Sequence, residues 1–497
     1  MFEQSAHTEE PRSCSDLRLP VGRKVKMAHL ELARRTFLKK AGQGLASLPL
    51  LAAMPAFVEA QTATKHDAKG NAAHVPLQPA VKLNVRDFGA VGDGKTKDTV
   101  AIQETLDRCS VLGGGEVLVP AGDYLTGAIV LRSNTLLRLD AQASLLGSPD
   151  MADYPITQVR WEGKWVRGYI GFISAMDADD IGIIGTGKIV GSPAITTRVD
   201  PTTHLRHPAL LEFVNCKNVN VQDCYTSQSS MWSIHPTYCE NVTFKNVMVK
   251  SGADGIDVDS CKHVVIDGCT FETTDDCISL KSGRGEEGYS IHRPTEDVHI
   301  SNCTFTDLHW ACIGIGSETS GGIRNVHVEH CKCLGARTFA IYIKSRPGRG
   351  AFIEDIWMND LEVSGAKLGF LRFNFLNSGK QDEDPVPGDE GIPTVRNFHF
   401  SNIRVTDVPM LVEGTGIEPH KPLDGFSLTN VTGTCGKGIY LANIKHAELR
   451  NIKVTGYSGP LLNTYNVTGT GLTGAAALPE PKLADAIAAP AVPYILH

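Results

Sequence analysis

The sequence predicts an all-β, single-domain right-handed parallel β-helix with an N-terminal capping helix. Three observations support this: one strand-like phrase recurs along the chain, its shortest spacings are nearly constant, and a helical segment precedes the copies. Each phrase alternates apolar and polar residues and includes a polar turn residue, the pattern of a short half-buried strand. The copies begin at Asn218, Asn241, His263, Asp297, Asn325, Asp355, Asn397, Gly425 and His446.

The spacing of the copies identifies a solenoid. Equivalent positions lie 21 to 23 residues apart at the closest, and up to 42 apart where the chain has insertions. Each coil buries its apolar face only by stacking on its neighbours. A leucine-rich repeat needs leucines at fixed offsets that are missing here, and a propeller needs a period about twice as long. In a parallel β-helix, insertions such as Gly283–Thr295 and Asn377–Thr394 become loops that wall one face.

The chain divides into four parts. We assign residues 1–60 to an export signal, 61–80 to a linker, 81–470 to the β-helix and 471–497 to an Ala/Pro-rich tail. Within the domain, Asp98 to Leu112 has helical periodicity and begins with an Asp cap. A helix at this place covers strand edges that the first coil leaves unpaired.

The export signal is indicated by Arg34 and Arg35, which precede the apolar stretch from Gly44 to Val58. This order resembles a twin-arginine signal, which sends folded bacterial proteins across the inner membrane. The alternative is a basic amphipathic helix or an uncleaved anchor, but the apolar run is too short to span a bilayer comfortably. We expect cleavage near Ala60, a periplasmic or secreted protein, and a true start at Met27.

The composition of the chain restricts the kinds of partner that the protein is expected to bind. The net charge is −7 and no basic stripe is present, which argues against nucleic acid. An acidic polysaccharide is compatible with this charge, because local charge in a cleft can oppose the total. No other stretch is long and apolar enough for membrane insertion. We expect a monomer.

The cysteines are predicted to be structural. Of the 13 cysteines, Cys224, Cys269, Cys303 and Cys331 occupy the same place in successive repeats, which favours a ladder of buried thiols. Cys331-Lys-Cys333 lacks the second pair that a zinc site requires. We therefore expect no metal and no cofactor.

Three carboxylates are the strongest functional signal. Asp254 precedes the Asp275-Asp276 pair by 21 and 22 residues, which places the two groups on adjacent coils. Neighbouring strands lie about 4.8 Å apart, so the carboxylates come within the range that two-carboxylate glycoside hydrolysis needs. Adjacent side chains in a strand face opposite ways, so a bend must aim Asp275 and Asp276 at one groove. The alternative is a turn pair at a strand end.

Four motifs have the order and spacing of a known family: Trp232-Ser-Ile-His-Pro236, Asp254-Gly-Ile-Asp257, Asp275-Asp-Cys277 and Ile315–Gly322. Together they resemble glycoside hydrolase family 28, the polygalacturonases and their rhamnogalacturonan-hydrolysing and exo-acting relatives. The resemblance implies inverting hydrolysis of α-glycosidic bonds in pectic polysaccharide or oligogalacturonide. It also implies that Asp275 is the general acid and that Asp254 and Asp276 activate water.

The chain departs from the family at two places, and both concern substrate binding. His309 lies one position from the expected histidine, where Trp310 stands instead. Either the loop brings His309 to the substrate, or the enzyme works without that histidine, and His309 is then a surface residue with no role. The family's Arg-Ile-Lys reads Tyr342-Ile-Lys344, which keeps the lysine as a partner for a uronic acid.

The lost arginine leaves its role to other residues. Tyr342 offers a flat surface for a sugar ring, or it points into the core. Arg346 and Arg349 supply the missing charge, or they are solvated in a glycine turn. This pattern favours an exo-acting or rhamnogalacturonan-type enzyme over a plain endo-polygalacturonase.

Two other functions compete with hydrolysis. A β-helical lyase could hold Ca²⁺ on the oxygen ligands of Asp254, Asp257, Asp259, Asp275 and Asp276. It would form an unsaturated, ultraviolet-absorbing product and fail in chelator. A non-catalytic β-helix would bind carbohydrate without turnover.

The twin arginine gives a first prediction. Changing Arg34 and Arg35 together to lysine should leave the uncleaved precursor in the cytoplasm, because that pathway reads the arginine pair. Cell fractionation and blotting for the processed form measure the outcome. Unchanged export of the double variant would contradict a twin-arginine signal.

Overall fold

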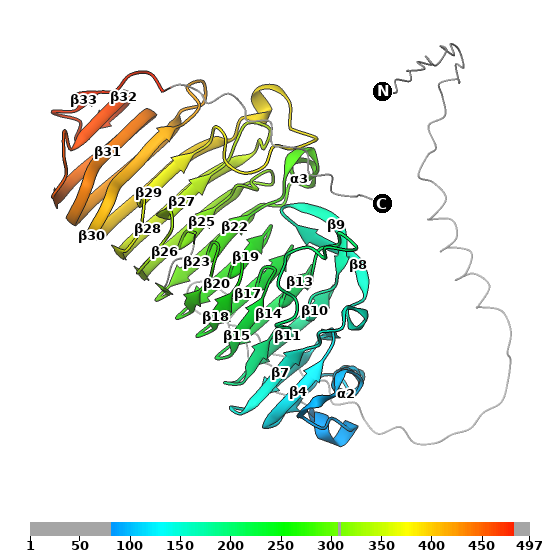
Figure 1. The fold of residues 1–497 in the computed structure, drawn as a ribbon. Helices are drawn as coiled ribbons and strands as arrows, with labels where there is room; N and C mark the ends of the chain where they lie inside the picture. Colours follow the sequence, from blue (N-terminus) through cyan, green and yellow to red (C-terminus); the bar gives the residue numbers. More distant parts are fainter. Residues whose placement is uncertain (1–80, 307–309, 482–497) are drawn as a thin grey trace, which may run out of the picture. The chain divides into compact units, whose positions relative to one another are not determined.

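The structure, a computed structural model, describes residues 81–306 and 310–481. The export signal, the linker, His309 and the end of the tail lie outside these residues. The described residues form a stack of parallel strands, shown in Figure 1. This confirms the predicted parallel β-helix.

The strands lie in three columns, each pairing in parallel with the coil before and after it. The first column holds β1 (Val81–Asn84), β3 (Gly115–Val119), β6 (Thr135–Leu139), β11 (Asp179–Ile184), β14 (Lys217–Gln222), β17 (Glu240–Lys245), β20 (Lys262–Asp267) and β23 (Thr295–Ser301). The second holds β2 (Asp93–Lys97), β4 (Gly122–Thr126), β7 (Ala143–Gly147), β12 (Lys188–Val190), β15 (Tyr225–Ser229), β18 (Met248–Ser251), β21 (Thr270–Glu272) and β24 (Thr304–Thr306).

The third column underlies the pocket described below. It holds β5 (Ile129–Val130), β10 (Ile173–Met176), β13 (Leu211–Val214), β16 (Ile234–Thr237), β19 (Ile256–Asp259), β22 (Ile278–Lys281), β25 (Ile313–Ile315), β27 (Phe339–Lys344) and β29 (Gly369–Asn374). Toward the C-terminus the strands lengthen and pass between columns: β26 (Ile323–Cys333), β28 (Phe352–Ser364), β30 (Thr394–Gly416), β31 (Leu423–Thr455), β32 (Leu462–Thr470) and β33 (Ala476–Ala477).

A few elements lie outside the columns. One antiparallel hairpin is formed by β8 (Ile156–Trp161) and β9 (Lys164–Tyr169), and it lies on the same flank as the short helix α3 (Gly285–Ile291) in Figure 1. Three short 3₁₀ turns complete the described elements: η1 (Val85–Phe88), η2 (Met151–Asp153) and η3 (Gly388–Gly391).

The predicted capping helix is α2 (Thr99–Val111), which covers the first coil. Its apolar face buries Ile102, Leu106 and Cys109 in the common core. Asp98 holds the N-cap position, but its carboxylate makes no hydrogen bond to the helix. It accepts instead from the backbone N–H groups of Val91 (2.7 Å) and Gly92 (3.0 Å). Asp98 therefore occupies the predicted cap position but does not cap the helix with its side chain, because the preceding loop binds the carboxylate instead.

Left-handed polar residues turn each coil. Asn218, Asn241 and Asn397 have φ of 56°, 58° and 59°, a conformation that asparagine tolerates better than most residues. The Asn241 amide donates to Oδ1 of Asn218 on the preceding coil (3.0 Å). This explains why the recurring phrases place Asn, Asp or His at fixed positions.

The core is aliphatic and contains the thiol ladder. Cys269, Cys303 and Cys331 are buried on successive coils, while Val247 takes the equivalent position between Cys224 and Cys269. All twelve cysteines among the described residues are free and buried. The predicted buried thiols are confirmed, with one valine interrupting the series.

The C-terminal boundary differs from the prediction. β32 ends at Thr470, the predicted end of the β-helix, but β33 pairs with β32 beyond it. Leu472 and Ala475 pack against the core. The first residues of the predicted tail therefore extend the stack. Within residues 81–306 and 310–481, no helix combines the length and apolarity of a membrane span.

Candidate active site

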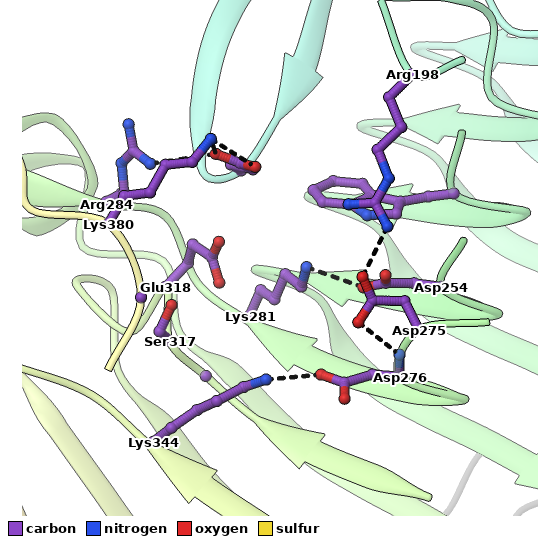
Figure 2. Close-up of a pocket in the computed structure, with 14 residues that line it drawn as sticks. Arg198, Asp254, Asp275, Asp276, Lys281, Arg284, Ser317, Glu318, Lys344 and Lys380 are labelled. Carbon is purple, nitrogen blue, oxygen red and sulfur yellow. Dashed lines mark hydrogen bonds and ion pairs between the residues drawn. The ribbon is translucent and has the colours of Figure 1, made fainter. Parts of the chain in front are cut away.

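A pocket of about 260 Å³ opens above the third column of strands, and Figure 2 shows its residues. Its lining is mostly charged. The lining residues are Glu162, Arg198, Trp232, Asp254, Asp275, Asp276, Lys281, Arg284, Gly316, Ser317, Glu318, Lys344, Gly379 and Lys380. Five of them are acidic and five are basic.

The stacking of coils brings the three predicted carboxylates together. β19 pairs with β22 so that Ile256 lies opposite Ile278. The N–H of Gly255 also donates to the carbonyl of Asp276 (3.0 Å). Asp254 and Asp276 therefore occupy neighbouring positions on adjacent coils, with Asp275 beside them in the same pocket.

A bend aims the adjacent aspartates at one pocket. The chain leaves strand geometry after β21, and β22 begins only at Ile278. In this bend the N–H of Asp276 donates to Oδ1 of Asp275 (3.1 Å). The N–H of Ala311 donates to Oδ1 of Asp276 (3.1 Å). The sequence required a bend here, and the structure contains it.

Asp254 and Asp276 share a hydroxyl partner. Oγ of Ser279 lies 3.4 Å from Oδ2 of Asp254 and 3.2 Å from Oδ2 of Asp276. The Lys344 ammonium donates to the same oxygen of Asp276 at 2.7 Å. Gly314 permits this arrangement, since a Cβ there would lie 2.4 Å from that oxygen.

Lys281 neutralises the deepest part of the site. Its ammonium lies 2.7 Å from Oδ1 of Asp257 and 3.3 Å from Oδ2 of Asp254. It also lies 3.9 Å from the ring centroid of Trp232, a cation–π distance. The three charged groups are almost fully buried, so the ammonium offsets part of the cost of burying two carboxyls.

Burial and charge shift the acidities of these groups. Burial raises the pKa of Asp254 to about 6, with Lys281 opposing the shift and Asp275 and Asp276 adding to it. Burial and the neighbouring Asp254 raise the pKa of Asp257 well above its usual range. Burial alone would raise the pKa of Glu318, but the surrounding cations, Lys281 first, lower it to about 2. Asp254 is thus placed to gain and lose a proton near pH 6.

Asp275 lies in a more open position than the other two aspartates. Its side chain is partly exposed, and Oδ2 accepts from Nη2 of Arg198 at 2.6 Å. Figure 2 shows Arg198 reaching Asp275 from the opposite side to Lys281 and Lys344. The three aspartates are therefore each paired with a different cation.

The predicted substrate-binding residues fall into two groups. Lys344 lines the pocket. Tyr342 is buried beside it, and its hydroxyl lies 3.0 Å from Oγ of Ser378. The flat surface expected of Tyr342 therefore does not line the pocket, and its hydroxyl instead contacts the Asn377–Thr394 insertion.

The two predicted arginines are buried and hold that same insertion. Arg346 donates to the carbonyl of Gly379 (2.9 Å). Arg349 pairs with Asp382 (2.9 Å), and burial lowers its pKa to about 10. Neither arginine lines the pocket, so the prediction that they meet the substrate differs from the structure. His309 lies outside the described residues.

Three segments distant in sequence meet at one end of the pocket. The Lys380 ammonium lies 2.7 Å from Glu162 in the β8–β9 turn, and Arg284 lies 3.5 Å from Glu162 and 2.9 Å from Asp382. We call Glu162, Arg284, Lys380 and Asp382 the ionic wall. Two further ion pairs join the same three segments: Lys164–Asp384 at 2.8 Å and Arg160–Glu287 at 2.8 Å.

Sequence reasoning missed much of this lining. Lys281 and Glu318 lie inside or beside motifs that the sequence analysis identified, so the sequence could have indicated that they belong to the site. Arg198 and Glu162 come from irregular segments outside the repeat, where no periodic signal exists. Both predicted insertions do reach the pocket, through Arg284 and Lys380.

The carboxylates do not form a cation site in the described part of the chain. No group of three or more metal-ligating side chains is found there. Asp254 and Asp257 face Lys281, and Asp259 pairs with Arg160 at 3.1 Å. Their oxygens are thus engaged by internal cations, which disfavours the Ca²⁺ arrangement of a lyase.

A β-helix with three convergent carboxylates in a polar pocket has the architecture of a carbohydrate-cleaving enzyme. The comparison of sequences agrees: the chain matches "Glycosyl hydrolases family 28" over residues 109–404. That match covers more than half of the chain. The chain belongs to this family and is a glycoside hydrolase.

Its relatives are distant. It is 29% identical to a probable polygalacturonase of Vitis vinifera over 363 residues, which are 70% of this chain and 73% of the relative. It is 26% identical to an exo-poly-alpha-D-galacturonosidase of Dickeya chrysanthemi over 462 residues, 81% of this chain and 72% of that protein. The solved structure of a hyperthermoactive exopolygalacturonase from Thermotoga maritima matches with a TM-score of 0.68 and 26% identity, covering 77% of this chain and 93% of that one.

The charge of Lys281 should set the acid limb of the pH profile. In the unaltered enzyme kcat/KM should rise through about pH 6 as Asp254 loses its proton. Lys281 favours the ionised form, so Lys281→Met should raise the pKa of Asp254 and move this limb to higher pH. Lys380→Met removes a pocket lysine that pairs with Glu162 instead, and should leave the limb in place. If the acid limb lay at the same pH in the unaltered enzyme and in both variants, Asp254 would not be the group that sets it.

Gly314 should be required for the position of Asp276. In Gly314→Ala the new methyl group would displace the carboxylate that Lys344 holds. Misplacement of a reacting group by about 1 Å costs roughly 10²-fold in rate, so kcat should fall by about that factor. Thermal melting should change little, since the methyl group points at a side chain of the pocket. A variant with normal kcat would show that Asp276 is not needed in this position.

Proposed function

We propose that the protein is an exo-acting polygalacturonase that hydrolyses α-glycosidic bonds of pectic polysaccharide with inversion. The observation on which this rests is the ionic wall standing at one end of a pocket that contains three convergent carboxylates. The named relatives and the Thermotoga maritima structure support the same reading.

The three carboxylates have different surroundings, and these suit them to different chemical roles. Asp275 is the most open of the three and is proposed to protonate the leaving glycosidic oxygen. Asp254 and Asp276 converge on Ser279 and are proposed to activate the attacking water. A pKa of about 6 leaves Asp254 ionised at neutral pH, as a base requires.

The cations of the pocket suit a uronic acid. Lys344 and Lys281 lie beside the carboxylates, and Lys344 is the residue proposed to meet a substrate carboxylate near the cleavage point. Burial would lower the pKa of Lys344, but Asp276, with Glu318 adding to its effect, raises this pKa above its usual value, so the charge persists. A charge-assisted hydrogen bond from such a group contributes about 1.5–3 kcal/mol.

The ionic wall favours cleavage from a chain end. An endo-acting enzyme needs a groove that continues on both sides of the cleavage point. Here the β8–β9 hairpin, the α3 segment and the loop around Lys380 are tied together by ion pairs across one end. The pocket is slightly smaller than the ~300–1,000 Å³ of typical ligand sites, which suits a short terminal segment of the polymer.

We also propose export to the periplasm or beyond, which fits a polymeric substrate that does not enter the cytoplasm. This proposal rests on Arg34 and Arg35 and the apolar run that follows them. The double lysine variant described above tests it.

Product analysis on polygalacturonate tests the proposed activity. The enzyme should release short galacturonides from the first minutes while viscosity falls slowly, and the first product should have the inverted anomeric configuration by NMR. Asp275→Asn should lower kcat by about 10²–10⁴-fold, because general acid assistance is lost in a nearly isosteric change.

Three outcomes would contradict the proposal. A rapid fall in viscosity would show endo action. An unsaturated, ultraviolet-absorbing product would show a lyase. Retention of more than about a tenth of kcat by Asp275→Asn would remove that residue from the role of acid.

A further inference from the structure

Every cation that lines the pocket already has an acidic partner. Lys281 faces Asp254 and Asp257, Lys344 faces Asp276, and Arg198 faces Asp275. Arg284 and Lys380 belong to the ionic wall. A polyanionic substrate therefore meets a site whose positive charges are occupied. A substrate carboxylate therefore competes with an acidic side chain for each cation that it approaches.

The ion pairs beside the reacting centre differ in how easily they can be exchanged. In the Lys281–Asp254 pair the side chains are 7% and 6% exposed, and in Lys344–Asp276 they are 15% and 4% exposed. In Arg198–Asp275 they are 38% and 34% exposed. Separating a buried pair leaves an uncompensated charge away from water, whereas an exposed pair contributes little and separates cheaply. Arg198 is therefore the cation that can move.

The backbone of Arg198 is held by hydrogen bonds, whereas its side chain is partly exposed. The residue lies in the loop between β12 and β13, and its carbonyl accepts from the N–H of His207 (3.0 Å). Its neighbour Val199 forms an antiparallel bridge with Arg206. Only the long side chain extends from this anchored point to Oδ2 of Asp275. A change of rotamer can break the pair without unfolding the loop.

We infer that Arg198 couples the charge of the substrate to the general acid. Without substrate, the guanidinium bonds to Oδ2 of Asp275. A uronic acid carboxylate entering beside it competes with Asp275 for the guanidinium, which binds carboxylates best in a bidentate geometry that the single Nη2 bond to Asp275 does not provide. Once Arg198 turns to the substrate, Asp275 is released from the pair and can carry the proton that it passes to the glycosidic oxygen. This inference rests on the proposed function and adds the role of Arg198 to it.

As a consequence, the enzyme prefers charged substrates at the step in which Asp275 donates its proton. A methyl-esterified or neutral sugar has no carboxylate with which to draw Arg198 away, so Asp275 stays paired. An acidic sugar gains a contact and frees the acid at once. Arg198 is thus a specificity-determining residue, distinct from the three aspartates and from Lys344.

The test uses the full-length enzyme, Arg198→Ala and Arg198→Lys, with trigalacturonate and its fully methyl-esterified form as a matched pair. For Arg198→Ala, KM on trigalacturonate should rise while kcat stays within a few-fold, and kcat/KM on the ester should not fall. The preference for acid over ester should drop roughly 10- to 100-fold, the loss expected for one charge-assisted bond. Arg198→Lys should restore part of the preference. Thermal melting checks that each variant folds.

Other results would overturn the inference. An equal loss of kcat on both substrates would show that Arg198 only orients Asp275. An unchanged preference would show that it does not meet the substrate. Absence of wild-type turnover on any galacturonide would instead overturn the proposed function, and this inference with it.

Discussion

The parallel, in-register stacking of successive coils positions both the core and the pocket of this protein. Because β19 pairs with β22 residue for residue, aspartates 22 positions apart in the chain become neighbours in the pocket. The same register stacks the left-handed asparagines at the turns and the thiols of the core. A shift of one residue would turn the inward and outward faces over, so the site and the core are fixed together.

Charge compensation shapes the pocket as much as backbone geometry does. Several carboxyls lie close together and largely buried, which is costly unless cations neutralise them. Lys281 forms ion pairs with Asp254 and Asp257, Lys344 with Asp276, and Arg198 with Asp275. The two lysines are buried and fixed, and the arginine is open. The ion pair of Arg198 is thus in contact with solvent, whereas those of Lys281 and Lys344 are largely shielded from it.

The end of the pocket is built from parts that the repeat does not contain. The β8–β9 hairpin, the α3 segment and the loop with Lys380 come from three different places in the chain, and ion pairs join them into the ionic wall. The buried Arg346 and Arg349 bond to residues of the last of these loops. Within one family, such additions to a constant β-helix can decide how a polymer enters while the carboxylates stay in place.

The β-helix, the buried thiols and the placing of the aspartates on adjacent coils could be predicted from the amino-acid sequence, because they follow from the spacing of the repeat. The capping helix could be predicted from its own helical periodicity. The contact partners became visible only in the folded chain. Asp98 accepts hydrogen bonds from a loop, Tyr342, Arg346 and Arg349 are buried, and Arg198 and Glu162 line the pocket. Those contacts join residues far apart in the chain through irregular segments. No periodicity constrains such segments, so their positions depend on packing and charge in the folded state.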